Sequence, residues 1–253
     1  MMKIISLFFF ILCGISSCIA ENDSLQLRLN SSINKAQNYL TQNQYHEPSY
    51  SLVFFKFLNK NKGAKIDIDS SYYYNVIKDN AICILQSLYT KEELCEVSPK
   101  YLIDSLLKFN DTVSALVIIG LNPLAINKKR TNKLFYKLNK SFDNYTITHL
   151  YFALKMIERT DVSLLNKRSK KISIQLTQKL KDYTHSNNIE LDLYIETLAF
   201  LTEFDNEIDC KSEIKNVIEL QNKDGGWSVR NTETESNLHS TFLSLWFLLN
   251  VQL

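Results

Sequence analysis

Two groups of titratable side chains stand where helices are expected to begin, and both could do acid–base chemistry. Asp192 opens one helix and His239 opens another, and Glu233 and Glu235 lie in the loop just before His239. Two carboxylates that face each other across a cleft can hydrolyse a glycosidic bond. The helix dipole also favours carboxylates near helix starts. These residues are therefore candidates for catalysis or for simple stabilisation of the helices.

Three cysteines lie beyond the first 20 residues: Cys83, Cys95 and Cys210. None belongs to a Cys-x-x-Cys motif, so a structural zinc site is not expected. Cys83 and Cys95 could be joined across a helix-turn-helix, and burial of Cys83 as a small apolar side chain explains it equally well. The sequence leaves this pairing open. Serine-hydrolase, Walker and dinucleotide-binding motifs do not occur in the chain.

The elements that position these groups are predicted to be helices. Proline marks element ends, since Ser98-Pro99 is typical of a helix start and Asn122-Pro123 of a helix end. Alternating strand patterns of useful length are absent. The run Val113–Leu121 is β-prone, but its flanking residues favour a buried helix. The sequence therefore predicts an all-α fold.

The helices of the C-terminal half alternate in character. Three are apolar around most of their circumference and should be buried, whereas two amphipathic helices between them should face water on one side. The buried helices are expected at 147–158, 191–204 and 238–250, and the amphipathic ones at 169–183 and 211–221.

This alternation has a period. Thr148, Thr197 and Thr241 occupy similar positions near the starts of the three buried helices, 49 and 44 residues apart. A two-helix unit of that length cannot bury its apolar face alone, and stacking the units buries it in one core. We therefore expect a single helical-repeat domain over residues 21–253, clearest over 145–253.

The most specific motif is the segment Gln-Asn-Lys-Asp-Gly-Gly-Trp at 221–227. Asp224, Gly225 and Gly226 favour the positive backbone angles of a tight reversal. Trp227 can bury a large face while its ring N–H finds a carbonyl. Together with Gln221 and the apolar helix after it, the segment resembles the repeat of squalene and oxidosqualene cyclases and of protein prenyltransferase β-subunits.

The resemblance implies an α/α toroid, in which inner helices surround a central cavity and outer helices wrap them. The helix pairs of this chain would form a small or open ring, and another right-handed helical-repeat solenoid is the alternative. In the family's repeat, the Gln braces the helix end and the aromatic side chain stacks against the Gln and the neighbouring helix.

The catalytic groups of these enzymes are only partly present. The cyclases use an Asp-x-Asp-Asp motif, and the segment at 67–70, Asp-Ile-Asp-Ser, lacks its second half. The prenyltransferases hold zinc through an Asp, a Cys two residues later and a His. Asp192 and His239 match this pattern, but Tyr194 replaces the thiolate. Because zinc needs three protein ligands, no cofactor is expected, and a helix cap is the expected role of Asp192.

The N-terminus predicts export. A short basic start precedes the apolar run Ile4–Leu12, which is too short to span a bilayer and typical of a signal peptide over residues 1–20. Cleavage after Ala20 would release a secreted or periplasmic protein. Alternatively, Cys18 ends a segment that resembles a bacterial lipoprotein box, and its lipidation would anchor the protein outside a bacterial membrane.

Charge gives no indication of a nucleic-acid partner, because the 253 residues carry a net charge of only +2. Basic clusters occur at 128–130 and 167–171. Solvated helix faces explain them, and an anionic partner such as lipid head groups is the alternative. A membrane is otherwise expected only through the N-terminal anchor.

We therefore expect an exported domain without catalysis that binds an apolar small molecule or a protein partner. A divergent terpene cyclase or prenyltransferase-like enzyme is the first alternative, and a carbohydrate-active α/α barrel is the second. The cavity distinguishes them. An apolar cavity with few charges favours ligand binding, and two facing carboxylates favour carbohydrate chemistry.

Overall fold

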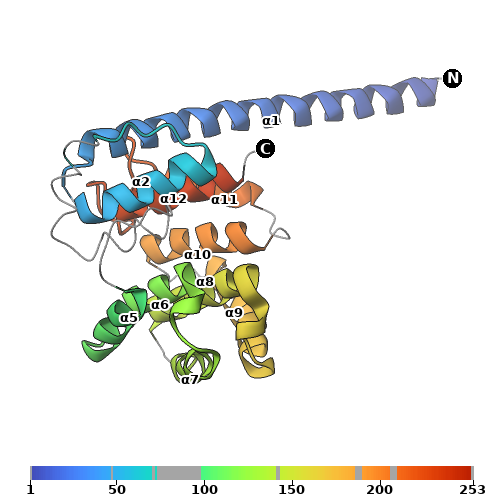
Figure 1. The fold of residues 1–253 in the computed structure, drawn as a ribbon. Helices are drawn as coiled ribbons and strands as arrows, with labels where there is room; N and C mark the ends of the chain where they lie inside the picture. The colour runs from blue at the N-terminus through green and yellow to red at the C-terminus, as the bar shows by residue number, and fades with distance from the viewer. Residues whose placement is uncertain are drawn as a thin grey trace.

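A computed structural model describes residues 2–46, 48–69, 72, 98–140, 143–185, 190–205 and 210–251, with side chains from residue 23 onward except 48–53. The regular elements of this part are helices, apart from one isolated bridge between Trp227 and Asn237 (Figure 1). The predicted all-α class is confirmed. The elements are α1 Met2–Asn43, α2 Pro48–Lys62, α5 Pro99–Lys108, α6 Thr112–Leu121, η1 Pro123–Ala125, α7 Lys128–Leu138, α8 Asn144–Asp161, η2 Val162–Leu164, α9 Lys167–Thr184, α10 Leu191–Phe204, α11 Lys211–Glu219 and α12 Leu238–Asn250.

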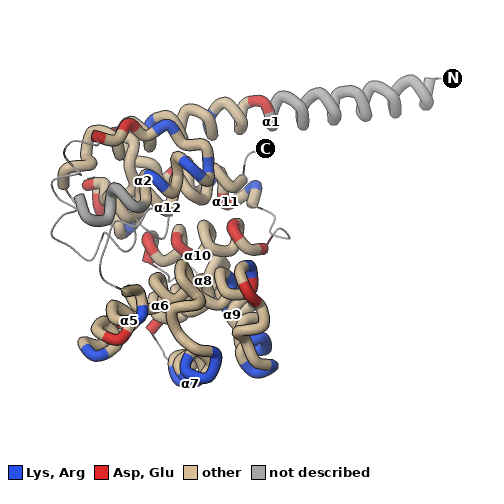
Figure 2. Tube along the Cα trace, in the orientation of Figure 1, with Lys and Arg blue, Asp and Glu red and all other residues tan. Residues whose placement is uncertain are grey.

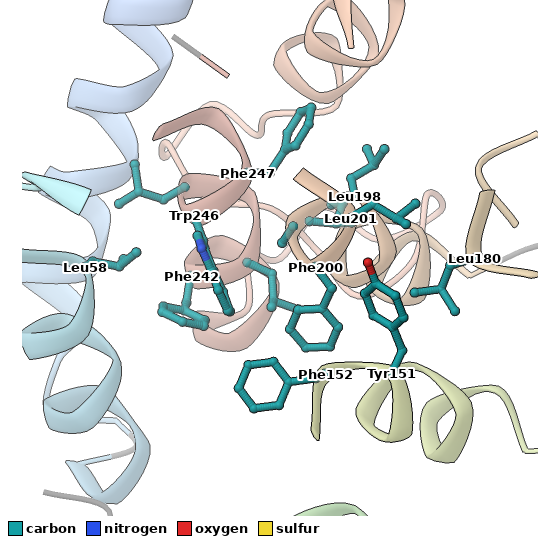
Figure 3. Close-up of a cluster of buried hydrophobic side chains, with 14 of the residues drawn as sticks. Leu58, Tyr151, Phe152, Leu180, Leu198, Phe200, Leu201, Phe242, Trp246 and Phe247 are labelled. Atoms are coloured by element: carbon teal, nitrogen blue, oxygen red, sulfur yellow. The ribbon is translucent and has the colours of Figure 1, made fainter. Parts of the chain in front are cut away.

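The three helices predicted to be buried are α8, α10 and α12, and α10 packs against both of the others. Aromatic side chains from the three helices pack together in one layer. The rings of Phe152 and Phe200 are 5.1 Å apart, and those of Phe200 and Trp246 are 5.6 Å apart (Figure 3). Each pair is separated by nearly one repeat in sequence. Hydrogen bonds join α10 and α12 near their N-terminal ends, from Ser240 to Asp192, and near their C-terminal ends, from Trp246 to Glu203, so these two helices run parallel. Equivalent aromatic contacts therefore recur at a spacing close to the predicted period.

The two N-terminal helices, α1 and α2, pack over the last helix, α12. α1 packs against α11 and α12, and α2 also packs against α12. Leu25 and Leu29 of α1 are buried, and the Tyr39 hydroxyl donates to the Ser236 carbonyl at 2.8 Å. Residues far apart in sequence therefore share one core, as Figure 1 shows for the stacked helices α1, α12 and α10.

The backbone of α1 is helical through the predicted cleavage point at Ala20. The side chain of Cys18 lies outside the described side chains, and Cys83 and Cys95 lie outside the described residues. Cleavage, lipidation and disulfide pairing therefore stay predictions, and Cys210 is partly buried against the core. Within the described part, no helix is long and apolar enough to cross a bilayer.

The turn at 221–227 joins α11 and α12 to α1. The Gln221 amide donates to the carbonyls of Gly225 at 2.8 Å and Ser32 at 3.0 Å, and its oxygen accepts from the Ser32 hydroxyl. The fully buried Trp227 ring donates its N–H to the Val217 carbonyl at 2.7 Å. The predicted carbonyl partner of the indole is confirmed, whereas Gln221 braces the turn and α1 rather than the end of α11 as predicted.

The two glycines of this turn are needed for different reasons. Gly225 has a φ of 96°, and a Cβ there would lie 2.6 Å from the Lys35 carbonyl oxygen. Gly226 does not have the predicted positive angle; instead, a Cβ there would lie 2.5 Å from the Ser236 Cβ. The turn therefore needs one glycine for its angle and both for close packing.

We expect Gly225→Ala to destabilise the protein more than Gly63→Ala does. Both positions have a positive φ, but a Cβ at Gly63 meets nothing within 4 Å. The angle alone should cost about 1 kcal/mol at each position, and the clash with α1 should add about 1–3 kcal/mol at Gly225. Denaturant unfolding measures both, and equal losses would contradict the proposed packing.

Candidate functional site

A buried carboxylate at the start of α10 connects three helices. Asp192 is 5% exposed and accepts hydrogen bonds from the Ser240 hydroxyl at 2.5 Å and the Tyr145 hydroxyl at 3.3 Å. The Nδ1 atom of His239 lies 3.3 Å from the same carboxylate. Tyr145 belongs to α8, whereas His239 and Ser240 belong to α12. Asp192 does not form the helix cap expected of it, because its carboxylate points to the neighbouring helices.

Electrostatics favour the ionised form of this carboxylate. Burial acts to raise the pKa of Asp192, but the hydrogen bond and charge of His239, with the hydroxyls of Ser240 and Tyr145, outweigh burial and lower it. An Asp–His pair is a possible general base. However, the buried Ser240 donates its proton to Asp192 rather than to His239, so the three residues do not form a nucleophile–base relay.

A second acid, Glu196, lies one turn further along α10 and is completely buried. It accepts a hydrogen bond from Thr148, and the Nδ1 atom of His149 lies 3.4 Å away. Among the described residues, its Oε2 atom has no hydrogen-bond partner. Burial raises the pKa of Glu196 despite the opposing charge of His149. The two acids of α10 are thus shifted in opposite directions.

The structure brings together two of the four predicted site residues. Asp192 and His239 are in contact, whereas Glu233 and Glu235 are exposed in the preceding loop, where Glu233 lies 3.6 Å from Arg230. Tyr194, which stands in place of the thiolate, interacts with Asn216 of α11. Among the described residues, no group of three His, Cys, Asp or Glu side chains could hold a metal ion.

A cavity of about 520 Å³ lies near the C-terminal ends of α2, α6, α8, α10 and α12. Aromatic and aliphatic side chains form most of its wall: Phe57, Leu121, Phe152, Met156, Phe204 and Trp246. Its polar residues are Lys60, Asn61, Lys62, Arg159 and Glu203. None of the four predicted site residues lines it, because they lie near the N-terminal ends of α10 and α12.

Glu203 is the polar centre of this cavity. Its carboxylate accepts hydrogen bonds from Lys62 of α2, from Arg159 of α8 at 2.8 Å and from the Trp246 indole of α12 at 3.0 Å. Burial acts to raise the pKa of Glu203, but the bonds from these three side chains outweigh it and lower the pKa.

Sequence reasoning missed Glu203 as a site residue, although one signal was available. A carboxylate in the last turn of an apolar helix opposes the helix dipole, so it requires cations from elsewhere in the fold.

Comparisons of the chain with protein-family models, with curated proteins and with solved structures find no match in any of the three. Function is therefore inferred from the geometry of this chain alone.

We expect Asp192→Asn to destabilise the protein by about 2 kcal/mol at neutral pH, because it disturbs a buried, hydrogen-bonded carboxylate. The folded-state pKa of Asp192 is below the ordinary 3.8. The unfolded chain therefore takes up this proton at a higher pH than the folded chain does, and the wild-type advantage should be lost as the pH falls through the folded pKa. Urea unfolding of both proteins at several pH values measures this, and an advantage that persists at the acid end would contradict it.

For Glu196→Gln, the stability advantage of the wild type should depend on pH in the opposite direction. Its folded-state pKa is above the ordinary 4.5, so the stability of the wild type relative to the Gln variant should be greatest below that value. This stability should fall as the pH rises through the folded pKa, because burial disfavours the ionised carboxylate. A stability difference that stays constant from acid to neutral pH would show that Glu196 is not perturbed by burial.

Proposed function

We propose that the protein is a non-catalytic binding module whose cavity holds an amphipathic molecule with an apolar chain and an anionic end group. The cavity is the observation that carries this proposal. Its volume of about 520 Å³ lies within the range of small-molecule sites, which are mostly apolar with a few polar groups that fix orientation.

The walls of the cavity support an apolar chain as the main part of the ligand. Phe57 packs edge-on against Trp246 with ring centroids 4.8 Å apart, and Phe152 approaches Phe204 at 6.0 Å. Aromatic rings held by such contacts provide rigid apolar surface, so little side-chain order is lost when a ligand binds.

The charges of the cavity support an anionic end group. Three cations line it, Lys60, Lys62 and Arg159, against one carboxylate, Glu203. Lys60 and Arg159 are exposed, whereas Glu203 is largely buried beneath the cavity surface. Lys62 and Arg159 both bond to Glu203, so two cations share one carboxylate, and this excess of positive charge would attract a carboxylate or phosphate.

The positions of the carboxylates favour a binding function over the two enzymatic alternatives, the carbohydrate-active barrel and the terpene cyclase. Glycoside hydrolysis needs two carboxylates flanking the substrate, and Glu203 is the one carboxylate among the described residues that line the cavity. Asp69, which belongs to the incomplete cyclase motif, accepts a hydrogen bond from the Tyr72 amide, as a helix cap does.

Ring closure and export are part of the proposal. α12 packs against α10 on one side and against α2 on another, as a closed ring of helix pairs would require, so the helices around the cavity would be the inner layer of an α/α toroid. Export rests on the N-terminal sequence, and it would place the cavity where extracellular or periplasmic amphiphiles are available.

Displacement of a fluorescent apolar probe tests the proposal. A long-chain carboxylate should displace the probe more effectively than the alcohol of the same chain length. Met156→Trp, which fills part of the cavity, should weaken both ligands by about tenfold or more. Lys60→Glu should weaken only the carboxylate, by roughly fivefold, and Lys223→Glu on the exposed motif turn is the matched control.

Each variant tests a different part of the proposal. If the probe does not bind, or if Met156→Trp leaves binding unchanged, the cavity is not the binding site. If the carboxylate and the alcohol bind equally and Lys60→Glu affects neither, the ligand has no anionic end group.

A further inference from the structure

Two turns next to the cavity expose apolar side chains. η1 follows α6 and η2 follows α8, and their residues Leu124 and Val162 are 73% and 48% exposed. Each of them lies three positions after a residue that lines the cavity, Leu121 and Arg159 respectively. A single exposed apolar side chain needs no explanation. Here two of them stand at equivalent places, and a basic helix follows each.

Positive charge is concentrated on those two helices. α7 and α9 carry eleven of the 29 Lys and Arg residues of the chain and one of its 27 Asp and Glu residues. The two helices therefore have a net charge of +10, which leaves −8 for the rest of a chain whose total is +2. Figure 2 shows this segregation, with basic residues along α7 and α9 on the side of the molecule remote from α1.

A buried asparagine fixes the two basic helix starts beside each other. Asn132 of α7 is 7% exposed and donates to the Leu164 carbonyl of η2 at 2.9 Å. Its carbonyl oxygen accepts from the Asn166 amide at 2.9 Å and from the Ser169 hydroxyl at 2.5 Å. Because these bonds lock η2 and the start of α9 onto α7, the charges belong to one preformed surface.

Acidic neighbours neutralise only part of this surface. Arg130 pairs with Asp104, and Asp161 interacts with Lys128. Lys129 and Lys170 are exposed. The Arg168 guanidinium lies 3.3 Å from the centroid of the Tyr136 ring, which holds this cation in place.

We infer that this surface, formed by Leu124, Val162 and the basic first turns of α7 and α9, docks onto an anionic lipid bilayer, from which the cavity exchanges its ligand. Exchange rests on the proposed function, whereas docking does not. Cations draw such a surface to anionic head groups, and apolar side chains then enter the boundary with the acyl chains. Exposed Leu and Val side chains match hydrocarbon, so a lipid surface fits better than a nucleic acid, whose binding rests on phosphate charge and base stacking.

Partitioning of the full chain between buffer and vesicles tests docking. One set of vesicles contains phosphatidylcholine alone, and the other also contains phosphatidylglycerol. The N-terminal segment is present in every variant, so differences among variants report on this surface. Wild-type binding should be stronger on the anionic vesicles and should weaken with salt.

Two double variants and their controls locate the contact. Lys129→Glu with Lys170→Glu should lower partitioning to anionic vesicles by roughly 25-fold. Leu124→Ser with Val162→Ser should lower it by about tenfold. Lys35→Glu with Lys223→Glu is the charge control, and Leu27→Ser is the apolar control, since Leu27 on α1 is 71% exposed. Both controls should bind as the wild type does.

Equal binding to neutral and anionic vesicles, or double variants that bind as their controls do, would overturn the inference. Binding to single-stranded DNA without preference for anionic vesicles would also overturn it. Probe displacement in solution separates the two proposals. If the probe binds but docking fails, only this inference is wrong. If docking succeeds but the probe does not bind, the proposed function and the exchange step are wrong, and the lipid contact stands.

Discussion

The buried carboxylate of Glu203 is the constraint on which the cavity depends. It stands in the last turn of the apolar helix α10 and accepts hydrogen bonds from Lys62 of α2, Arg159 of α8 and Trp246 of α12. A buried charge is costly unless it is paired and hydrogen-bonded. These four helix ends must therefore stay close to the carboxylate, and the space between them keeps apolar walls around a charged centre.

Buried carboxylates also hold the N-terminal end of α10, where they stabilise the packing of the helices rather than surround a cavity. Asp192 joins α10 to α8 and α12, and Glu196 contacts Thr148 and His149 one turn further along. Between the two ends, the ring of Phe200 fills the layer with aromatic contacts (Figure 3). Because the hydroxyl of Ser240 is buried against Asp192, this end contributes to stability and register, and the open space lies at the other end.

The sequence was sufficient for the fold class and for the buried helices, since apolar periodicity reflects burial directly. It also predicted the partner of the Trp227 indole, which follows from the local turn. A central cavity was expected only from the family resemblance, and its charged centre was not predicted, because Lys62, Arg159 and Glu203 are far apart in the chain and no local pattern joins them. It assigned Asp192 to a helix cap for a similar reason: the competing partners come from other helices.

The proposed function requires that the space beside Glu203 is occupied by the chain of an amphiphile. A crystal structure of the protein with a long-chain carboxylate that carries bromine at its far end tests this claim most directly. We expect an anomalous bromine signal among Phe152, Met156 and Trp246, with the carboxylate near Lys60 and Arg159. A bromine signal outside the cavity, or a cavity without ligand at saturating concentration, would contradict it.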